Sequence, residues 1–110
     1  MMLKAFVMSV NRGQEAEYEQ RHSPIWPELG ATLRAHGVRD YSIFLHPETN
    51  QLFAVATIED EAQWNAIAET PVCKRWWAHM KDIMPSNPDN SPQSIELREV
   101  FRLQQAGDGA

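Results

Sequence analysis

The chain has 110 residues and a mass of 12.6 kDa, a length that suits a single domain. Its 15 Asp and Glu residues outnumber its 10 Lys and Arg residues, and the resulting net charge of −5 argues against nucleic acid or an anionic membrane as a partner, since both attract concentrated basic charge. Hydrophobic residues make up 43% and charged residues 23%, which is the composition of an ordinary globular domain and excludes long disorder.

The first predicted element is a β-strand. Residues 3–10 are apolar and rich in strand formers, and Asn11-Arg12-Gly13 then signals a turn. This run is too short for the apolar core of a signal peptide and far below the ~20 apolar residues that cross a bilayer. We therefore expect a cytoplasmic protein with no membrane segment.

Two helical segments follow the strand. Residues 14–21 are charged and favour a helix. Ser23 followed by Pro24 has the pattern of an N-cap and a first-turn proline, which predicts a second helix over residues 24–36 with Gly37 as its stop.

A β-hairpin is predicted next. Residues 38–46 alternate with period two, residues 47–50 have the composition of a turn, and residues 51–59 form a second β-rich run. Asp60 is then placed to cap a helix, and Thr70 precedes another helical segment that ends near residue 80.

The last third of the chain changes character. Residues 84–92 hold three prolines among turn-forming side chains, which predicts a loop. Residues 94–103 have a β-like pattern, and residues 104–110 are polar and rich in glycine. We expect one domain over residues 1–103 and a flexible C-terminal tail over residues 104–110.

The predicted order is β-α-β-β-α-β, which makes an α+β fold: a four-stranded antiparallel sheet with the helices on one face. The strands are apolar at both parities, as Val7 beside Met8 and Leu52 beside Phe53 illustrate. A sheet that is apolar on both faces needs a second cover, so we expect a homodimer whose subunits pack sheet to sheet.

Metal and cofactor sites are not predicted. The four histidines are scattered without ligand spacing. His36 and His46 have ordinary structural interpretations, whereas His79, which follows the Trp pair, is left open between a structural and a functional role. Cys73 is the single cysteine and is interpreted as a small buried hydrophobe rather than a catalytic thiol. The glycines form no phosphate-binding loop.

Acid–base chemistry has better support. Tyr18 and His22 are four residues apart on a predicted helix, so both side chains point to one side. Histidine can give and take protons near neutral pH because its ordinary pKa is ~6.5. The alternative interpretation is a surface histidine in a charged helix, and spacing alone does not decide between them.

Aromatic side chains suggest a binding cavity. Trp76 and Trp77 are adjacent, and on a helix their rings diverge by ~100°, so one can enter the core while the other lines a cavity. Indole faces and Tyr41, on a predicted strand, suit a sugar, and the polar side chains of residues 87–91 suit a polyol. The structural alternative is ordinary core packing of both tryptophans and a plain connecting loop.

Five stretches together are specific for one known family. They are Lys4-Ala5-Phe6-Val7-Met8, Tyr18-x-x-x-His22-x-Pro24-Ile25-Trp26-Pro27-Glu28-Leu29, the Trp64-Asn65 helix, Val72-Cys73-x-Arg75-Trp76-Trp77 and Met84-Pro85-x-Asn87-Pro88-Asp89-Asn90-Ser91-Pro92. They closely resemble the L-rhamnose mutarotase family, and the resemblance extends through Glu99-Val100-Phe101. It implies a cytoplasmic homodimer of ferredoxin-like, dimeric α/β-barrel subunits that uses no metal or cofactor.

The resemblance also implies a reaction and a site. The family interconverts the α and β anomers of L-rhamnose by opening and closing the pyranose ring. His22 is implied as the proton donor, which we assign to the ring oxygen, and the sugar is implied to be bound by Tyr18, Tyr41, Trp76 and Trp77. The base stays open between a second histidine, a loop carboxylate and a bound water.

Two alternative functions remain. Dimeric α/β-barrel folds also include monooxygenases, either cofactor-free or haem-dependent, which would consume oxygen. A non-catalytic sugar sensor would bind sugar and leave the rate of anomer exchange unchanged.

Overall fold

The computed structural model describes residues 1–103, so the predicted tail over residues 104–110 lies outside the described residues. The elements, in chain order, are β1 (Met2–Ser9), α1 (Glu15–Arg21), α2 (Pro27–Ala35), β2 (Val38–His46), β3 (Gln51–Ile58), α3 (Glu61–Ile67), α4 (Pro71–Met80) and β4 (Ile95–Glu96). The predicted order is confirmed, with a pair of short helices at each helical position.

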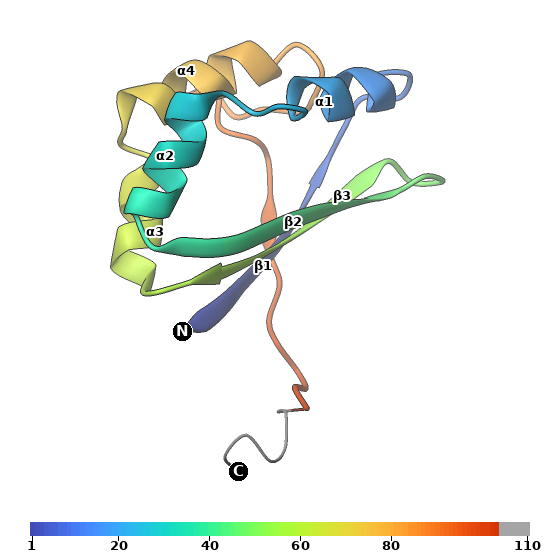
Figure 1. The fold of residues 1–110 in the computed structure, drawn as a ribbon. Helices are drawn as coiled ribbons and strands as arrows, with labels where there is room; N and C mark the ends of the chain where they lie inside the picture. The colour runs from blue at the N-terminus through green and yellow to red at the C-terminus, as the bar shows by residue number, and fades with distance from the viewer. Residues whose placement is uncertain (104–110) are drawn as a thin grey trace.

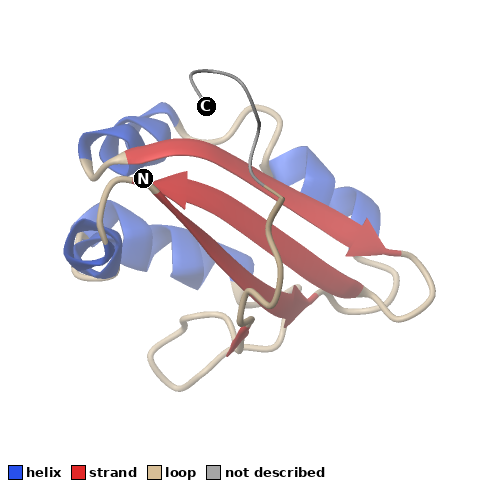
Figure 2. Ribbon diagram, turned by 90° about the horizontal axis from the view of Figure 1, so that it is seen from below, coloured by secondary structure: helices blue, strands red, loops and turns tan. Residues whose placement is uncertain are grey.

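The sheet is antiparallel throughout and has the strand order β2-β3-β1-β4. Strand β3 is central and pairs with both β1 and β2, so that Ala54 lies between Phe6 and Ile43. The helices of the described residues lie on one side of the sheet (Figure 1). Seen from below, the strands lie in front and the helices behind them (Figure 2). The predicted ferredoxin-like α+β fold is confirmed.

The central strand shows how the two faces of the sheet differ. On β3, Leu52, Ala54 and Ala56 are at most 2% exposed and face the helices. Phe53 and Val55 alternate with them and face the uncovered side, where Val55 is 38% exposed. The prediction of two apolar faces is therefore confirmed, and only one face is covered within the described chain.

Side-chain caps start the two C-terminal helices, and the sequence predicts the one at Asp60. Asp60 accepts a hydrogen bond from the backbone N–H of Gln63 at 2.7 Å, and Thr70 accepts one from Cys73 at 3.3 Å. Losing such a cap typically costs ~1 kcal/mol. Within residues 1–103, no helix combines the length and the apolar character needed to cross a membrane.

The start of α2 differs from the prediction. The helix begins at Pro27 rather than at Pro24, and Ser23 is not its N-cap. Trp26 precedes Pro27 with φ −54° and ψ 129°, because a residue before proline is pushed out of the helical region. The segment from Ser23 to Trp26 is therefore a connection that brings Trp26 towards α4.

The last strand is also shorter than predicted. Residues 94–103 were expected to be β-like, but only Ile95 and Glu96 pair with β1, followed by one hydrogen bond from the N–H of Leu97 to the carbonyl of Ala5. Beyond that point Phe101 is 77% exposed. Strand β1 itself continues to Met2, but the segment after Leu97 does not pair with it.

Candidate active site

A cavity of about 1080 Å³ opens between the helices and the covered face of the sheet. It is bordered by all four helices of the described residues, the sheet and the loop that precedes β4. All the predicted site residues are among those that line it, namely Tyr18, His22, Tyr41, Trp76 and Trp77. The structure thus brings together side chains from two helices and one strand that the sequence places far apart.

Small residues in the middle of the sheet leave room for this cavity. Ala54 pairs with Phe6 on β1, and Ala56 pairs with Tyr41 on β2. Because β3 carries only methyl groups here, the rings of Phe6 and Tyr41 approach each other across it, with centroids 6.4 Å apart. Trp64 of α3 packs on both rings, at 6.0 and 5.9 Å, and completes an aromatic wall.

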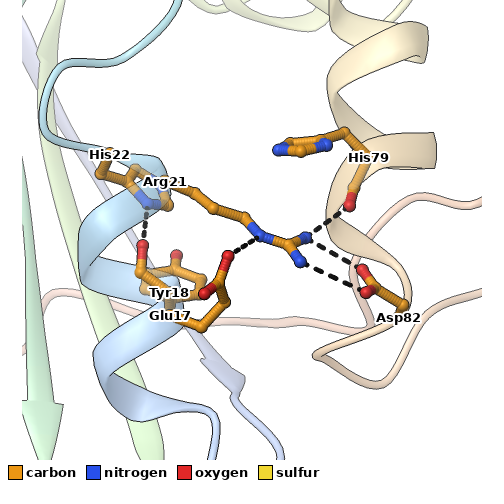
Figure 3. A network of polar contacts seen from close by, with 6 residues as sticks. All are labelled: Glu17, Tyr18, Arg21, His22, His79 and Asp82. Carbon is orange, nitrogen blue, oxygen red and sulfur yellow. Dashed lines mark hydrogen bonds and ion pairs between the residues drawn. The ribbon is translucent and has the colours of Figure 1, made fainter.

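His22 is the C-cap of α1, and its contacts define which nitrogen is free. Its backbone N–H donates to the carbonyl of Glu19 at 3.1 Å. Its Nδ1 lies 2.7 Å from the carbonyl oxygen of Tyr18 (Figure 3), and since that oxygen can only accept, Nδ1 carries the hydrogen. Nε2 is therefore the nitrogen that can exchange a proton with a ligand.

Burial sets the charge of this imidazole. His22 is half-buried, and burial lowers its pKa below the ordinary value of 6.5, while the hydrogen bond to the Tyr18 carbonyl partly opposes that shift. His22 is consequently neutral at neutral pH, with a lone pair on Nε2.

Aromatic rings surround His22. The ring of Tyr18 lies 4.4 Å away, and the ring of Trp76 stands nearly perpendicular to the imidazole at 5.2 Å. Trp76 in turn contacts the rings of Trp26 at 5.0 Å and His79 at 5.7 Å. It is only 9% exposed, so Trp76 both belongs to the core and forms part of the cavity wall.

Trp77 has a different environment, as the predicted divergence of the two indoles requires. It is half-buried and packs against both hydrophobic clusters of the molecule, while it also lines the cavity. Each of the two tryptophans thus packs in the hydrophobic core and also lines the cavity.

The two phenols stay protonated at neutral pH. Burial raises the pKa of Tyr18 to about 12 and raises the pKa of Tyr41 as well. Tyr41 is nevertheless 37% exposed, and because its side chain lines the cavity, we ascribe that exposure to the cavity rather than to the outer surface. Both hydroxyl groups can donate hydrogen bonds to a ligand.

The loop before β4 contributes polar side chains, as expected for residues 87–91. Asn87 and Ser91 line the cavity, whereas Asp89 does not. The loop is held closed by a hydrogen bond from the N–H of Asn87 to the carbonyl of Ser91 at 2.7 Å and by a β-bridge between Ser86 and Pro92.

One residue that lines the cavity and one that packs behind its wall were not predicted. Trp64 belongs to a motif of the family resemblance that gives it no role, yet it lines the cavity beside Tyr41. Trp26 appeared in a family motif without a role and packs on Trp76. The presence of four tryptophans in 110 residues is the sequence signal that could have identified them.

Metal-ligand geometry is not formed in the described part of the chain. Within residues 1–103, no group of three or more His, Cys, Asp and Glu side chains is placed to hold a metal ion. Cys73 is buried, and burial raises its pKa to about 11, so its thiol is not ionised at neutral pH.

Comparison with known proteins agrees with this geometry. The family model described as L-rhamnose mutarotase matches residues 4–103. A protein of Opitutus terrae named L-rhamnose mutarotase is 69% identical over 103 residues, which cover 94% of this chain and 99% of that protein. This chain belongs to the L-rhamnose mutarotase family.

Solved structures include both a member of this family and proteins that share only its fold. The crystal structure of an L-rhamnose mutarotase from Formosa agariphila has a TM-score of 0.87 and 44% identity, covering 94% of this chain and all of that one. A putative antibiotic biosynthesis monooxygenase from Bordetella bronchiseptica has a TM-score of 0.66 but 15% identity, over 90% of this chain and 96% of that one. The monooxygenase shares the fold alone with the L-rhamnose mutarotase family.

Proposed function

We propose that this chain interconverts the α and β anomers of L-rhamnopyranose by general acid–base ring opening and closure. Its family membership supports the substrate and the reaction class. The observation that carries the chemistry is the free Nε2 of a neutral His22 inside a cavity walled by indole and phenol rings.

In the proposed reaction His22 delivers a proton to the ring oxygen. As the anomeric hydroxyl loses its proton, its oxygen forms the carbonyl and the bond between C1 and the ring oxygen breaks. The bonding electron pair goes to the ring oxygen, which takes up a proton. Rotation about C1–C2 and the reverse steps then close the ring on the other face, with no net change in atoms or electrons.

We propose that the same Nε2 also acts as the base. Of the three alternatives that the sequence leaves open, the other histidines and the loop carboxylate Asp89 are not among the residues that line the cavity, and a bound water is the remaining alternative to Nε2. A neutral imidazole must gain a proton before it can donate one. The anomeric hydroxyl and the ring oxygen are bonded to the same carbon, so a nitrogen that takes the proton from the hydroxyl is close to the ring oxygen that needs one. The histidine of serine hydrolases works in this way, taking a proton from one oxygen and giving it to a leaving group.

The remaining predicted residues are proposed to bind the sugar. Trp76 and Trp77 offer apolar faces for the C–H groups and the methyl group of a 6-deoxy sugar. Tyr18 and Tyr41 keep their hydroxyl hydrogens at neutral pH and can orient sugar hydroxyls.

We also propose the homodimer predicted from the sequence. The uncovered face of the sheet presents Leu3 at 44% exposure, Phe44 at 63% and Val55 at 38%, a concentration of apolar surface that favours association. A second copy packed there would complete a dimeric α/β barrel. A cytoplasmic location and the lack of a nucleic-acid partner stay predictions.

The proposed activity can be tested by saturation-transfer NMR on L-rhamnose. We expect the protein to increase the exchange rate between the two anomeric proton signals, and to do so less for sugars that lack the 6-deoxy methyl group. Sugar binding with an unchanged exchange rate would identify a sensor instead. Oxygen consumption with an aromatic substrate, and no effect on anomer exchange, would favour a monooxygenase.

A further inference from the structure

Arg21 joins the end of α1 to the end of α4. Its Nη1 donates to Asp82 Oδ1 at 2.9 Å and to the carbonyl oxygen of His79 at 2.6 Å, and its Nη2 donates to Asp82 Oδ2 at 3.2 Å. Its Nε donates to Glu17 at 2.8 Å within α1. Figure 3 shows the side chain extending from α1 to the chain at the end of α4. The planar fork of an arginine is what makes this set of contacts possible, since it donates in several fixed directions at once.

The arginine side of this junction is largely buried. The Arg21 side chain is only 14% exposed, although Asp82 is 65% exposed. The carbonyl of His79 belongs to the last turn of α4, where helix carbonyls lack intrahelical partners, so Arg21 also satisfies a helix end. The hydrogen bonds from Arg21 are the largest cause of the lowered pKa of Asp82, which therefore stays ionised at neutral pH.

His22 follows Arg21 directly, and its own polar contacts do not connect it to α4. Its backbone N–H and its Nδ1 both donate to carbonyls of α1, those of Glu19 and Tyr18. Its link to α4 is the edge contact with the ring of Trp76. The placement of the imidazole against the Trp76 wall therefore depends on where the last turn of α1 lies relative to α4.

Few other contacts hold that last turn. Helix α1 has seven residues, and Tyr18 is its one buried side chain. The segment before α1 is tied separately, by a hydrogen bond from the N–H of Asn11 to the carbonyl of Ile83 at 2.8 Å. Loss of the Arg21 contacts should thus leave the start of α1 in place and release its end.

We propose that Arg21 is a positioning residue for His22: by clamping the end of α1 to Asp82 and the carbonyl of His79, it holds the imidazole at the cavity wall. This inference rests on the proposed role of His22, and it adds a residue that does not touch the substrate. A displacement of about 1 Å at a reacting group can cost on the order of 100-fold in rate, so a clamp of this kind has a measurable effect.

The chain offers a matched control. Arg75 of α4 donates to Glu28 of α2 at 2.8 Å, which is another ion pair between two helices. Its side chain is 55% exposed, compared with 14% for Arg21. Arg75 precedes Trp76 but is not itself among the residues that line the cavity, and it does not contact the end of α1. An exposed single contact of this kind contributes little to stability.

The experiment compares Arg21→Gln, Arg21→Lys and Asp82→Asn with Arg75→Gln. Anomer exchange of L-rhamnose gives kcat and KM, and the ring signals of His22 are titrated by NMR, a readout that does not depend on turnover. We expect Arg21→Gln to lower kcat by about 10- to 100-fold with a smaller change in KM, and to move the His22 pKa back towards its ordinary value. Arg21→Lys should recover part of the loss, and Arg75→Gln should stay within about twofold of the unmodified protein.

Each outcome bears on the proposal. Unchanged kcat and unchanged His22 signals in Arg21→Gln would overturn it, as would an equal loss in Arg75→Gln. If Arg21→Gln does not fold, Asp82→Asn removes one partner and keeps the arginine, and it must show the same direction of change. If the unmodified protein does not accelerate anomer exchange, the proposed function fails, whereas the His22 titration still decides whether Arg21 positions the imidazole.

Discussion

The ring of His22 meets the ring of Trp76 edge-on, with centroids 5.2 Å apart and an interplanar angle of 85°. One residue ends α1 and the other lies within α4. With Nδ1 engaged by the Tyr18 carbonyl, this contact leaves the imidazole a defined orientation in the cavity wall. The proposed function depends on that orientation, and the following predictions test the proposal.

Removal of the imidazole should abolish most of the activity. We expect His22→Ala to lower the anomer exchange rate by about 10²- to 10⁴-fold, the usual contribution of a positioned proton-transfer group. His36→Ala is the matched control, because His36 is also a helix C-cap whose Nδ1 donates to a carbonyl four residues earlier, that of Thr32 at 2.8 Å, but it is not among the cavity residues. A normal rate in His22→Ala would remove His22 from the mechanism.

Activity should rise with pH and then level off. Below its pKa, Nε2 of His22 carries a proton and cannot take one from the anomeric hydroxyl, so kcat/KM should fall as the pH decreases through that pKa. Burial lowers the pKa, and the midpoint should therefore lie below 6.5. Above it the rate should stay constant, because the pKa of Tyr18 is raised to about 12. A rate that increases towards acidic pH would show that the imidazolium form begins the reaction.

The two tryptophans should respond differently to substitution. Trp77 is half-buried at the cavity, so Trp77→Phe should raise KM for L-rhamnose about fivefold, equivalent to about 1 kcal/mol of aromatic contact, with little effect on kcat. Trp76 is 9% exposed and supports His22, so Trp76→Ala should lower the free energy of unfolding by about 3–5 kcal/mol. Kinetics and denaturant unfolding are measured for both variants. The assignment is contradicted if Trp77→Phe mainly lowers the free energy of unfolding while Trp76→Ala mainly raises KM.

Local sequence patterns predict much of this molecule because the relevant forces act over a few residues. Strand β2 has the predicted bounds, the cap at Asp60 forms as expected, and a helix follows Thr70 as predicted. The pair Tyr18 and His22 follows from helix periodicity, and the structure places both side chains at one cavity.

Contacts between distant segments could not be predicted in the same way. Arg21 has a visible partner in Glu17, one helical turn away, but its contact with Asp82 exists only once α1 and α4 are packed. Strand β4 is shorter than its pattern predicts: its pairing with β1 covers Ile95 and Glu96, although β1 continues to Met2. A local β-like pattern does not show where a segment stops pairing with its neighbour.

The uncovered face of the sheet should determine the oligomeric state. Val55 lies on the central strand, between Ala5 and Ser42, with its side chain on the face that the helices do not cover. Val55→Glu would place a charge in the proposed interface, where it would lose its hydration, and should convert the dimer into a monomer. Ala31→Glu adds the same charge at an exposed position of α2 and should leave the dimer intact. Sedimentation or light scattering gives the mass directly, and a monomeric unmodified protein, or an unchanged dimer in Val55→Glu, would show that the subunits do not pack sheet to sheet.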